Sequence, residues 1–226
     1  MDDESRALFR QFAARAFGAA AVLLLASCAS APPGGPFELW PVGPGGNAIP
    51  LDEAIRWEKP GVQIVVEPLT TRQREAWLRR HAGTEGDPLD RPAGPTLITF
   101  RMRLTATADK PVHLETQSVR LIPDEGGAGK APFDYTRAFE LLRPDQTEGP
   151  AREEIDLFMR GLLDGPVIVT PGTAREGLVV FPDPSPESRL VVLVVPFVQV
   201  GGETHEMKLA FEKIFTAERA ASASGG

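Results

Sequence analysis

The sequence of 226 residues contains a single cysteine, Cys28, and three histidines. One thiol excludes an internal disulfide, so the free energy of folding has to come from the packed core. The histidines, His81, His113 and His205, share no metal-ligand spacing with one another, and we predict no metal site. No apolar run reaches the roughly twenty residues that a transmembrane helix needs, since the run at residues 16–26 is much shorter.

Positive charge is also scarce relative to negative charge. The chain has 31 Asp and Glu against 24 Lys and Arg, which gives a formal net charge of -7. Nucleic-acid binding requires basic side chains gathered on one face, and the densest basic segment, residues 72–80, is interrupted by Glu75. We therefore predict that no nucleic acid is a partner.

Glycine and proline are abundant, with 22 residues of each. Both end regular elements and set turns, so many short elements are expected. Strand-like segments separated by turn residues about every ten positions are typical of a sandwich of two sheets. The sequence therefore predicts a mainly β fold, an immunoglobulin-like antiparallel β-sandwich of about seven strands with two accessory α-helices.

Apolar and polar side chains alternate most clearly at residues 98–104, a half-buried strand. A turn at 109–111 follows, and we expect a hairpin between 98–104 and 112–122, with a bulge where the parity of the apolar residues changes. The first half of residues 190–200 is apolar on both faces, as in a central strand, and Pro196 predicts a bend or bulge there. Other strands are predicted at residues 62–66, 176–181 and 205–215, the last entered through a Gly201-Gly202 turn.

Two segments carry helical signals. Thr70 and Gln73 have the spacing of a capping box that opens a helix over residues 71–81, with Gly83 beyond its end. A second helix is predicted over residues 151–163 and is expected to cover an open end or edge of the sandwich. Its apolar stripe consists of Ile155, Phe158, Met159, Leu162 and Leu163.

Residues 1–27 read as an export signal. The apolar run at 16–26 follows Arg10 and Arg15, and its length suits the core of a signal peptide, which needs about 7 to 15 residues. An ordinary secretory signal cleaved near residues 29–31 is one interpretation of this segment.

The residues directly after the apolar run favour a different interpretation. Leu25-Ala26-Ser27-Cys28 resembles the lipobox of bacterial lipoproteins. The resemblance implies that the signal peptidase recognises Leu25, Ala26 and Ser27, that it cleaves before Cys28, and that the Cys28 thiol carries lipid. Several acyl chains anchor a protein stably where one does not. By the same resemblance, Ala29 in place of aspartate favours delivery to the periplasmic leaflet of the outer membrane.

The chain after the lipobox is predicted to have three parts. Residues 28–47 are rich in proline and glycine, and we expect a tether that holds the domain away from the bilayer. Residues 48–217 are expected to form the sandwich domain. Residues 218–226 contain mostly alanine, serine and glycine and are expected to be a disordered tail.

Residues 165–182 read GPVIVTPGTAREGLVVFP. Pro171 and Gly172 fit the two central positions of a type II turn, and Gly177 allows a neighbouring backbone or aromatic ring to approach. This segment resembles one found in immunoglobulin-like domains of bacterial surface lipoproteins of unassigned role. The shared residues are structural, so the resemblance implies a fold and no active site.

No catalytic signature is recognisable. The sequence lacks a Gly-x-Ser-x-Gly nucleophile elbow, and no base adjoins Ser118, Ser185 or Ser188. The carboxylates of the predicted second helix fall away from its apolar stripe, which favours a solvated face; they are Glu153, Glu154 and Asp156. The glycines that might cradle a phosphate sit between strands and are expected to form a hairpin connection; they are Gly126, Gly127 and Gly129. We predict that the protein is not an enzyme and needs no cofactor.

The three tryptophans complete the set of candidate residues. Trp57 and Trp77 are expected in the core or between helix and sheet. For Trp40, packing onto the sandwich is expected, and an exposed docking element is the alternative.

These features together predict a membrane-anchored periplasmic lipoprotein that acts as a non-enzymatic protein-interaction or envelope-assembly module. Its expected partners are the membrane, through lipid on Cys28, and another envelope protein. The alternative is a small-ligand-binding lipoprotein with a pocket between the sandwich and the helix at 151–163.

Overall fold

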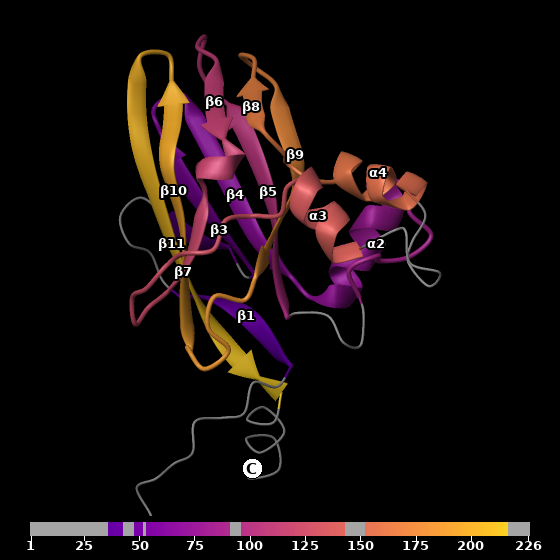
Figure 1. Ribbon diagram of the computed structural model, residues 1–226. Helices are drawn as coiled ribbons and strands as arrows, with labels where there is room; N and C mark the ends of the chain where they lie inside the picture. The colour runs from indigo at the N-terminus through magenta and orange to yellow at the C-terminus, as the bar shows by residue number, and fades with distance from the viewer. Residues whose placement is uncertain (1–35, 43–47, 52, 91–95, 143–151, 217–226) are drawn as a thin grey trace, which may run out of the picture. The chain divides into compact units, whose positions relative to one another are not determined.

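Two antiparallel sheets and three α-helices make up the described part of the chain (Figure 1). The chain divides into two units, Met1–Gly34 and Gly35–Gly226. The computed structural model describes residues 36–42, 48–51, 53–90, 96–142 and 152–216, all in the second unit. The strands are β1 (Phe37–Val42), β2 (Ala48–Leu51), β3 (Ala54–Lys59), β4 (Val62–Leu69), β5 (Leu97–Ala106), β6 (Val112–Glu115), β7 (Arg120–Pro123), β8 (Pro166–Val169), β9 (Ala174–Pro182), β10 (Leu190–Val200) and β11 (Glu203–Phe215). The helices are α2 (Thr71–His81), α3 (Tyr135–Leu142) and α4 (Arg152–Arg160), with a 3-10 turn, η1 (Thr116–Ser118).

The strand order is that of an immunoglobulin-like sandwich. The first sheet, sheet A, has the order β1-β11-β10-β6-β8, and β7 also pairs with β10. The second sheet, sheet B, has the order β2-β3-β4-β5-β9. Strands β4, β5 and β9 stand as A, B and E of the immunoglobulin fold, and β6 with β7, β8, β10 and β11 stand as C, C′, F and G. The predicted fold class is therefore confirmed, with β1, β2 and β3 as strands beyond the predicted seven.

The main core lies between the two sheets. Inward-facing side chains alternate along each strand, as in Ile64 and Val66 of β4 or Leu193 and Val195 of β10. Phe100 of β5 packs against Phe211 of sheet A, with tilted rings whose centroids lie 4.8 Å apart. Trp57 is 3% exposed in this core, which confirms its predicted place.

A second apolar cluster joins the helices to the outer face of sheet B. Leu178 and Val180 of β9 are fully buried on this face, because the three helices cover the β9 side of the sheet (Figure 1). Trp77 lies in the same cluster, in agreement with its predicted helix-to-sheet packing. Helix α3, which the sequence did not predict, contributes Ala138 and Leu142. Three described helices therefore replace the two that were expected.

The first predicted helix is confirmed at both ends. The Thr70 side chain accepts from the Gln73 N–H, and the Gln73 side chain accepts from the Thr70 N–H at 2.8 Å. The second helix is shorter than predicted, because α4 ends at Arg160. Leu162 and Leu163 are buried, yet they lie beside β9 and not on a helix: the Leu163 N–H donates to the Leu178 carbonyl at 2.8 Å.

The predicted hairpin between residues 98–104 and 112–122 is wrong. Strand β5 pairs with β4 on one side and with β9 on the other. Both of its edges are thus occupied, and the turn at 109–111 carries the chain across to sheet A, where β6 and β7 pair with β10. The predicted parity change between 112 and 122 comes from η1, which separates β6 from β7. The bulge predicted at Pro196 is confirmed by a register shift between Val195 and Val198.

The predicted tether, residues 28–47, is too long at its C-terminal side. Residues 37–42 form β1, which pairs with β11 from Phe37 opposite Phe215 to Val42 opposite Ala210. Phe37 and Leu39 alternate toward the core, and the burial of these side chains stabilises the pairing of the segment although it contains Pro41. The rest of the predicted tether is described only in part, and the signal segment and the tail lie outside the described residues.

Two turns contain a glycine with a positive φ, and the sequence predicted the one at Pro171-Gly172. Gly172 has φ +74, and the Thr173 N–H donates to the Thr170 carbonyl at 3.1 Å, as a type II turn requires. Gly61 has φ +88, and a Cβ there would meet Val200 Cγ1 at 2.7 Å. Only glycine satisfies both constraints at Gly61, and this turn holds β3 and β4 against the end of β10.

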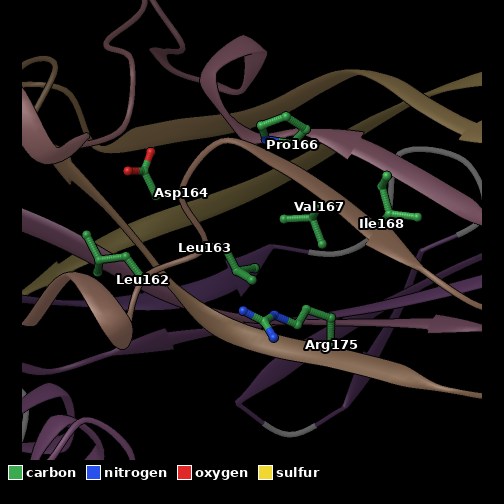
Figure 2. A pocket seen from close by; sticks show the side chains of 7 residues that line it. All are labelled: Leu162, Leu163, Asp164, Pro166, Val167, Ile168 and Arg175. Carbon is green, nitrogen blue, oxygen red and sulfur yellow. The ribbon is translucent and has the colours of Figure 1, made fainter. Parts of the chain in front are cut away.

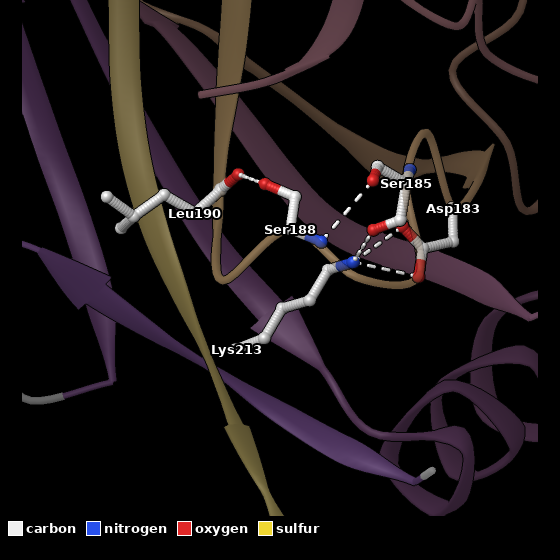
Figure 3. Close-up of polar contacts among 5 residues, drawn as sticks. All are labelled: Asp183, Ser185, Ser188, Leu190 and Lys213. Carbon is white, nitrogen blue, oxygen red and sulfur yellow. Dashed lines mark hydrogen bonds and ion pairs between the residues drawn. The ribbon is translucent and has the colours of Figure 1, made fainter. Parts of the chain in front are cut away.

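A buried ion pair closes the opposite end of the sandwich (Figure 3). Lys213 of β11 donates to the two Asp183 carboxylate oxygens at 2.7 and 2.9 Å and to the Ser185 carbonyl at 2.6 Å. The two side chains are 0% and 3% exposed, and the Lys213 nitrogen lies 4.8 Å from the centre of the Phe37 ring. This contact ties the connection between β9 and β10 to β11 and β1.

Candidate functional site

The outer face of sheet A carries apolar side chains that no described element covers. Residues that alternate with the core positions point to this face. One row of them crosses four neighbouring strands: Val42 pairs with Ala210, Ala210 with Val192, and Val192 with Ile122. We call this surface the apolar face; its half-exposed members are Val42, Ile122, Leu190, Val192, Val194 and Ile214.

Trp40 lies on the apolar face, on β1. It stands opposite Glu212, which in turn stands opposite Leu190. Its neighbours in sequence, Leu39 and Pro41, pair with inward-facing residues of β11. Trp40 is 46% exposed, so the expected packing of this residue onto the sandwich is wrong, and the exposed alternative describes it.

Phe197 and Ile168 extend the apolar face toward the other end of sheet A. The bulge after Val195 leaves both Pro196 and Phe197 pointing outward, and Phe197 is 55% exposed. Ile168 of the edge strand β8 is 59% exposed and pairs with His113. Large apolar side chains are costly to leave in water, at about 25 cal/mol per Å² of apolar area. Such a face is the kind of surface that protein partners cover.

The outer face of sheet B differs in chemistry. Arg101 forms ion pairs with Glu67 of β4 and, at 3.6 Å, with Glu176 of β9. Arg103 is exposed and pairs across the strand with Glu176. The outer face of sheet B therefore carries ion pairs beside the part that the helices cover. The outer face of sheet A carries large exposed apolar side chains together with charged residues such as Lys208 and Glu212.

A hollow of about 210 Å³ opens between β8 and β9, at one side of the sandwich (Figure 2). Its apolar lining includes Leu163 and Val167, which are 3% and 7% exposed, and its polar rim includes Asp164 and Arg175. Asp164 accepts a hydrogen bond from Gln117 at 3.0 Å. Leu162 and Leu163 are the only lining residues that fall within the segment predicted as the second helix, and the buried apolar residues of α4 itself pack into the second cluster.

The predicted lipidation site, Cys28, and the predicted recognition residues Leu25, Ala26 and Ser27 lie outside the described residues. None of the helices in the described part of the chain has both the length and the hydropathy that a membrane span requires.

The three histidines lie on different elements. His81 of α2 stacks on Trp77, with ring centroids 4.3 Å apart, and its Nδ1 lies 3.0 Å from the Trp77 carbonyl. His113 lies on β6, and His205 of β11 makes an edge contact with the Trp57 ring. Among the described residues, no group of three or more His, Cys, Asp or Glu side chains has the geometry of a metal site.

The other polar candidates take part in local contacts. The Ser118 hydroxyl donates to the Glu115 carbonyl at 2.7 Å, and the Ser188 hydroxyl donates to the Leu190 carbonyl at 2.7 Å. The Ser185 hydroxyl accepts from the Ser188 N–H.

On α4, Glu153 is exposed and Glu154 half-exposed, and Asp156 accepts from the Tyr135 hydroxyl at 3.2 Å. The glycines at 126, 127 and 129 form the predicted hairpin connection, because Leu121 and Lys130 pair across it.

Gly177 meets the expectation of a close approach, although the neighbour is Leu163 and not an aromatic ring. A Cβ at Gly177 would lie 2.9 Å from Leu163 Cγ and 3.1 Å from the Leu163 backbone nitrogen. This approach brings Leu163 into the wall of the hollow.

Sequence reasoning did not identify Ile168, Phe197 or Arg175 as candidates. Residues 166–169 are a short continuous apolar run that was not predicted as a strand, and such a run does not show which of its side chains points outward. Pro196 was the available signal for Phe197, because a bulge places two successive side chains on one face.

The comparisons with known proteins identify no family. No protein-family model matches the chain, and no curated protein sequence matches it. A solved structure described as "X-ray structure of Northeast Structural Genomics Consortium target SoR45" is similar with a TM-score of 0.28 and 11% sequence identity, over 69% of this chain and 85% of that chain. A similarity this weak carries no conclusion about the fold or the function.

Proposed function

We propose that this protein is a lipoprotein, anchored through Cys28 in the periplasmic leaflet of the outer membrane, and that it acts as a non-enzymatic protein-interaction module. The lipobox-like residues Leu25 to Cys28 support the anchor. Residues 29–36 separate Cys28 from β1, so the tether is short. A domain on a short tether has a higher effective concentration toward other membrane-bound proteins than toward proteins that diffuse freely.

The observation that carries the interaction is the apolar face. Of the five large apolar side chains that are exposed among the described residues, three lie on this one face: Trp40, Phe197 and Ile168. Aromatic side chains are the commonest anchors of protein interfaces. The partner is therefore a protein whose own surface is apolar where it meets sheet A.

Site-specific photo-crosslinking in the cell envelope tests this interaction. A benzophenone side chain replaces Trp40 or Phe197 in the full chain, and Arg103, exposed on the outer face of sheet B, is the matched control. We expect the same adduct from positions 40 and 197 and none from 103. Equal capture from both faces, or no adduct from positions 40 and 197, overturns the proposal.

The identified partner then allows a quantitative check. With both purified proteins, Trp40→Ala is expected to weaken binding by about tenfold or more, as truncation of an aromatic anchor does. Arg103→Ala is the control and should leave the Kd unchanged. A Trp40→Ala variant that binds like the parent chain contradicts the assignment of this face.

The anchor has its own test. In cells that carry Cys28→Ser, we expect the signal segment to stay uncleaved or the protein to lose its lipid, and metabolic labelling with a fatty acid separates these forms from the parent. The matched control is Ser30→Ala, which leaves the thiol in place. A Cys28→Ser protein that is fully processed and still carries label sinks the lipoprotein assignment.

A further inference from the structure

Strand β8 is an edge of sheet A, and its backbone is open on one side. It pairs with β6, and no other described strand pairs with it. The sheet beyond β8 ends beside the hollow that opens toward β9 (Figure 2). The free side of β8 and the hollow thus form one continuous surface.

The pairing register shows which backbone groups of β8 face outward. The Thr116 N–H donates to the Gly165 carbonyl at 3.4 Å, which makes residues 116 and 165 a hydrogen-bonded pair. Antiparallel pairs alternate between bonded and non-bonded, so Val167 and Val169 bond to β6, and Ile168 directs its N–H and its carbonyl away from β6. Pro166, which has no N–H to leave unpaired, occupies the other outward-facing position.

The hollow beside this edge has one apolar and one charged part. Leu163 and Val167 form the apolar part. Arg175, on the rim, is exposed and makes no hydrogen bond or ion pair with any described residue. A guanidinium presents several donors in one plane and matches a carboxylate closely.

We propose that β8 receives an added strand: an extended peptide segment of the partner protein, with an apolar side chain in the hollow and a carboxylate at Arg175. This inference rests on the proposed function, and it assigns the mode of binding and the chemistry of the partner. The residue that pairs with Ile168 exchanges both backbone hydrogen bonds with it and lies on the apolar face. Its two neighbours point to the hollow, one opposite Val167 and one opposite Val169.

A peptide that fits this edge carries one acid and one apolar residue, two positions apart, on the side that faces the hollow. Figure 2 shows the Arg175 side chain extending toward Leu163, and both residues line the same hollow. The acetylated and amidated peptide KTEVLTK has this spacing, with Val paired to Ile168.

The test is a titration of this peptide into the isotope-labelled mature chain, followed by amide NMR. We expect the Ile168 amide to shift and to gain protection from hydrogen exchange. Methylation of the peptide's Val nitrogen should weaken binding by about tenfold, as the loss of one to two hydrogen bonds does. Equal binding of the methylated peptide means that only the hollow is occupied and overturns strand addition.

Three variants test the backbone hydrogen bond and the charge separately. Ile168→Pro removes an N–H that the fold itself does not use and should abolish binding, whereas Ile168→Thr keeps the N–H and should retain most of it. Arg175→Gln should weaken the binding of the parent peptide and leave unchanged the binding of a peptide with Gln in place of Glu. Circular dichroism confirms that each variant is folded; if Ile168→Pro is not, the methylated peptide and Arg175→Gln decide the question.

Other outcomes have defined meanings. If the Ile168 amide is already protected in the free protein and the molecular mass rises with concentration, a second copy of this chain covers the edge, and the proposal is wrong. If the partner captured at positions 40 and 197 binds Ile168→Pro and Arg175→Gln with unchanged Kd, strand addition fails while the proposed function stands. If no partner is captured at all, the proposed function itself fails.

Discussion

Replacing Lys213 by methionine should cost more stability than any single surface change in this protein. The ammonium group has three hydrogens, and each has an acceptor: two on Asp183 and one on the Ser185 carbonyl. Lys213→Met keeps the length and most of the volume of the side chain but leaves the Asp183 carboxylate, 3% exposed, without its cation. Breaking a buried pair in this way costs about 3–5 kcal/mol.

Lys208 provides the matched control on the same strand. It also pairs with a carboxylate, Glu206, at 2.9 Å, but the two side chains are 58% and 51% exposed. Exposed pairs contribute about 0–1 kcal/mol, so Lys208→Met should change stability very little. Urea unfolding of the mature chain, followed by tryptophan fluorescence, gives both values.

The same pair allows a stricter test. Lys213→Met with Asp183→Leu removes both charges, and such apolar replacements are often neutral or stabilising. We expect the double variant to regain most of the stability that Lys213→Met loses. If Lys213→Met unfolds the protein outright, Asp183→Asn supplies a milder single change to the same ion pair, and its stability is compared in its place. A cost for Lys213→Met no larger than that for Lys208→Met would refute the reasoning.

Two further predictions concern local geometry. Gly61→Ala should destabilise the protein by about 2–4 kcal/mol, because the φ of +88 is unfavourable for alanine and the new Cβ would meet Val200 at 2.7 Å. Gly202→Ala is the control and should be close to neutral, because there is open space around its Cβ. Thermal melts compare the stabilities of the two variants. Thr70→Ala should cost about 1 kcal/mol of stability through loss of the cap on the Gln73 N–H. Thr70→Ser keeps a hydroxyl and should retain the stability of the parent chain. An unchanged melting temperature for Thr70→Ala contradicts the role of the cap.

Local signals in the sequence predicted local structure well. The capping box of Thr70 and Gln73 fixes the start of α2, because its hydrogen bonds join residues only three apart. The turn at Pro171-Gly172 forms for the same kind of reason, since a positive φ selects glycine wherever the chain is folded. Neither feature depends on what the rest of the chain does.

Pairing between distant segments was less predictable. A turn at 109–111 suits a hairpin and a crossover equally, and β5 crosses over because β4 and β9 occupy its two edges. The apolar stripe of α4 continues through Leu162 and Leu163, which the sequence could not distinguish from helix. These two residues instead lie beside β9, where Gly177 permits the backbone of Leu163 to approach.

The candidate site was predictable only in part, because exposure is a property of the whole sheet. Trp40 alternates with Leu39 and Pro41 in a pattern that suits either face, and the pairing of β1 with β11 decides that it points outward. Ile168 lies in an apolar run whose outward side depends on the register with β6. The sequence analysis predicted neither segment as a strand, and which side chains reach solvent follows only from their pairing with β11 and β6.

Strands β8 and β9, one edge of each sheet, differ in how their outer side is covered. At the C-terminal half of β9, the Leu178 N–H donates to the Gly161 carbonyl at 2.9 Å, and the Val180 carbonyl accepts from Phe133 at 2.7 Å. Proteins usually protect an exposed edge by covering it, by charge or by a bulge. On β8 the residue whose backbone groups face away from β6 is Ile168, an apolar residue that is 59% exposed, so charge does not protect this position. A covered β9 and an open β8 fit a domain in which a partner's strand extends sheet A at β8.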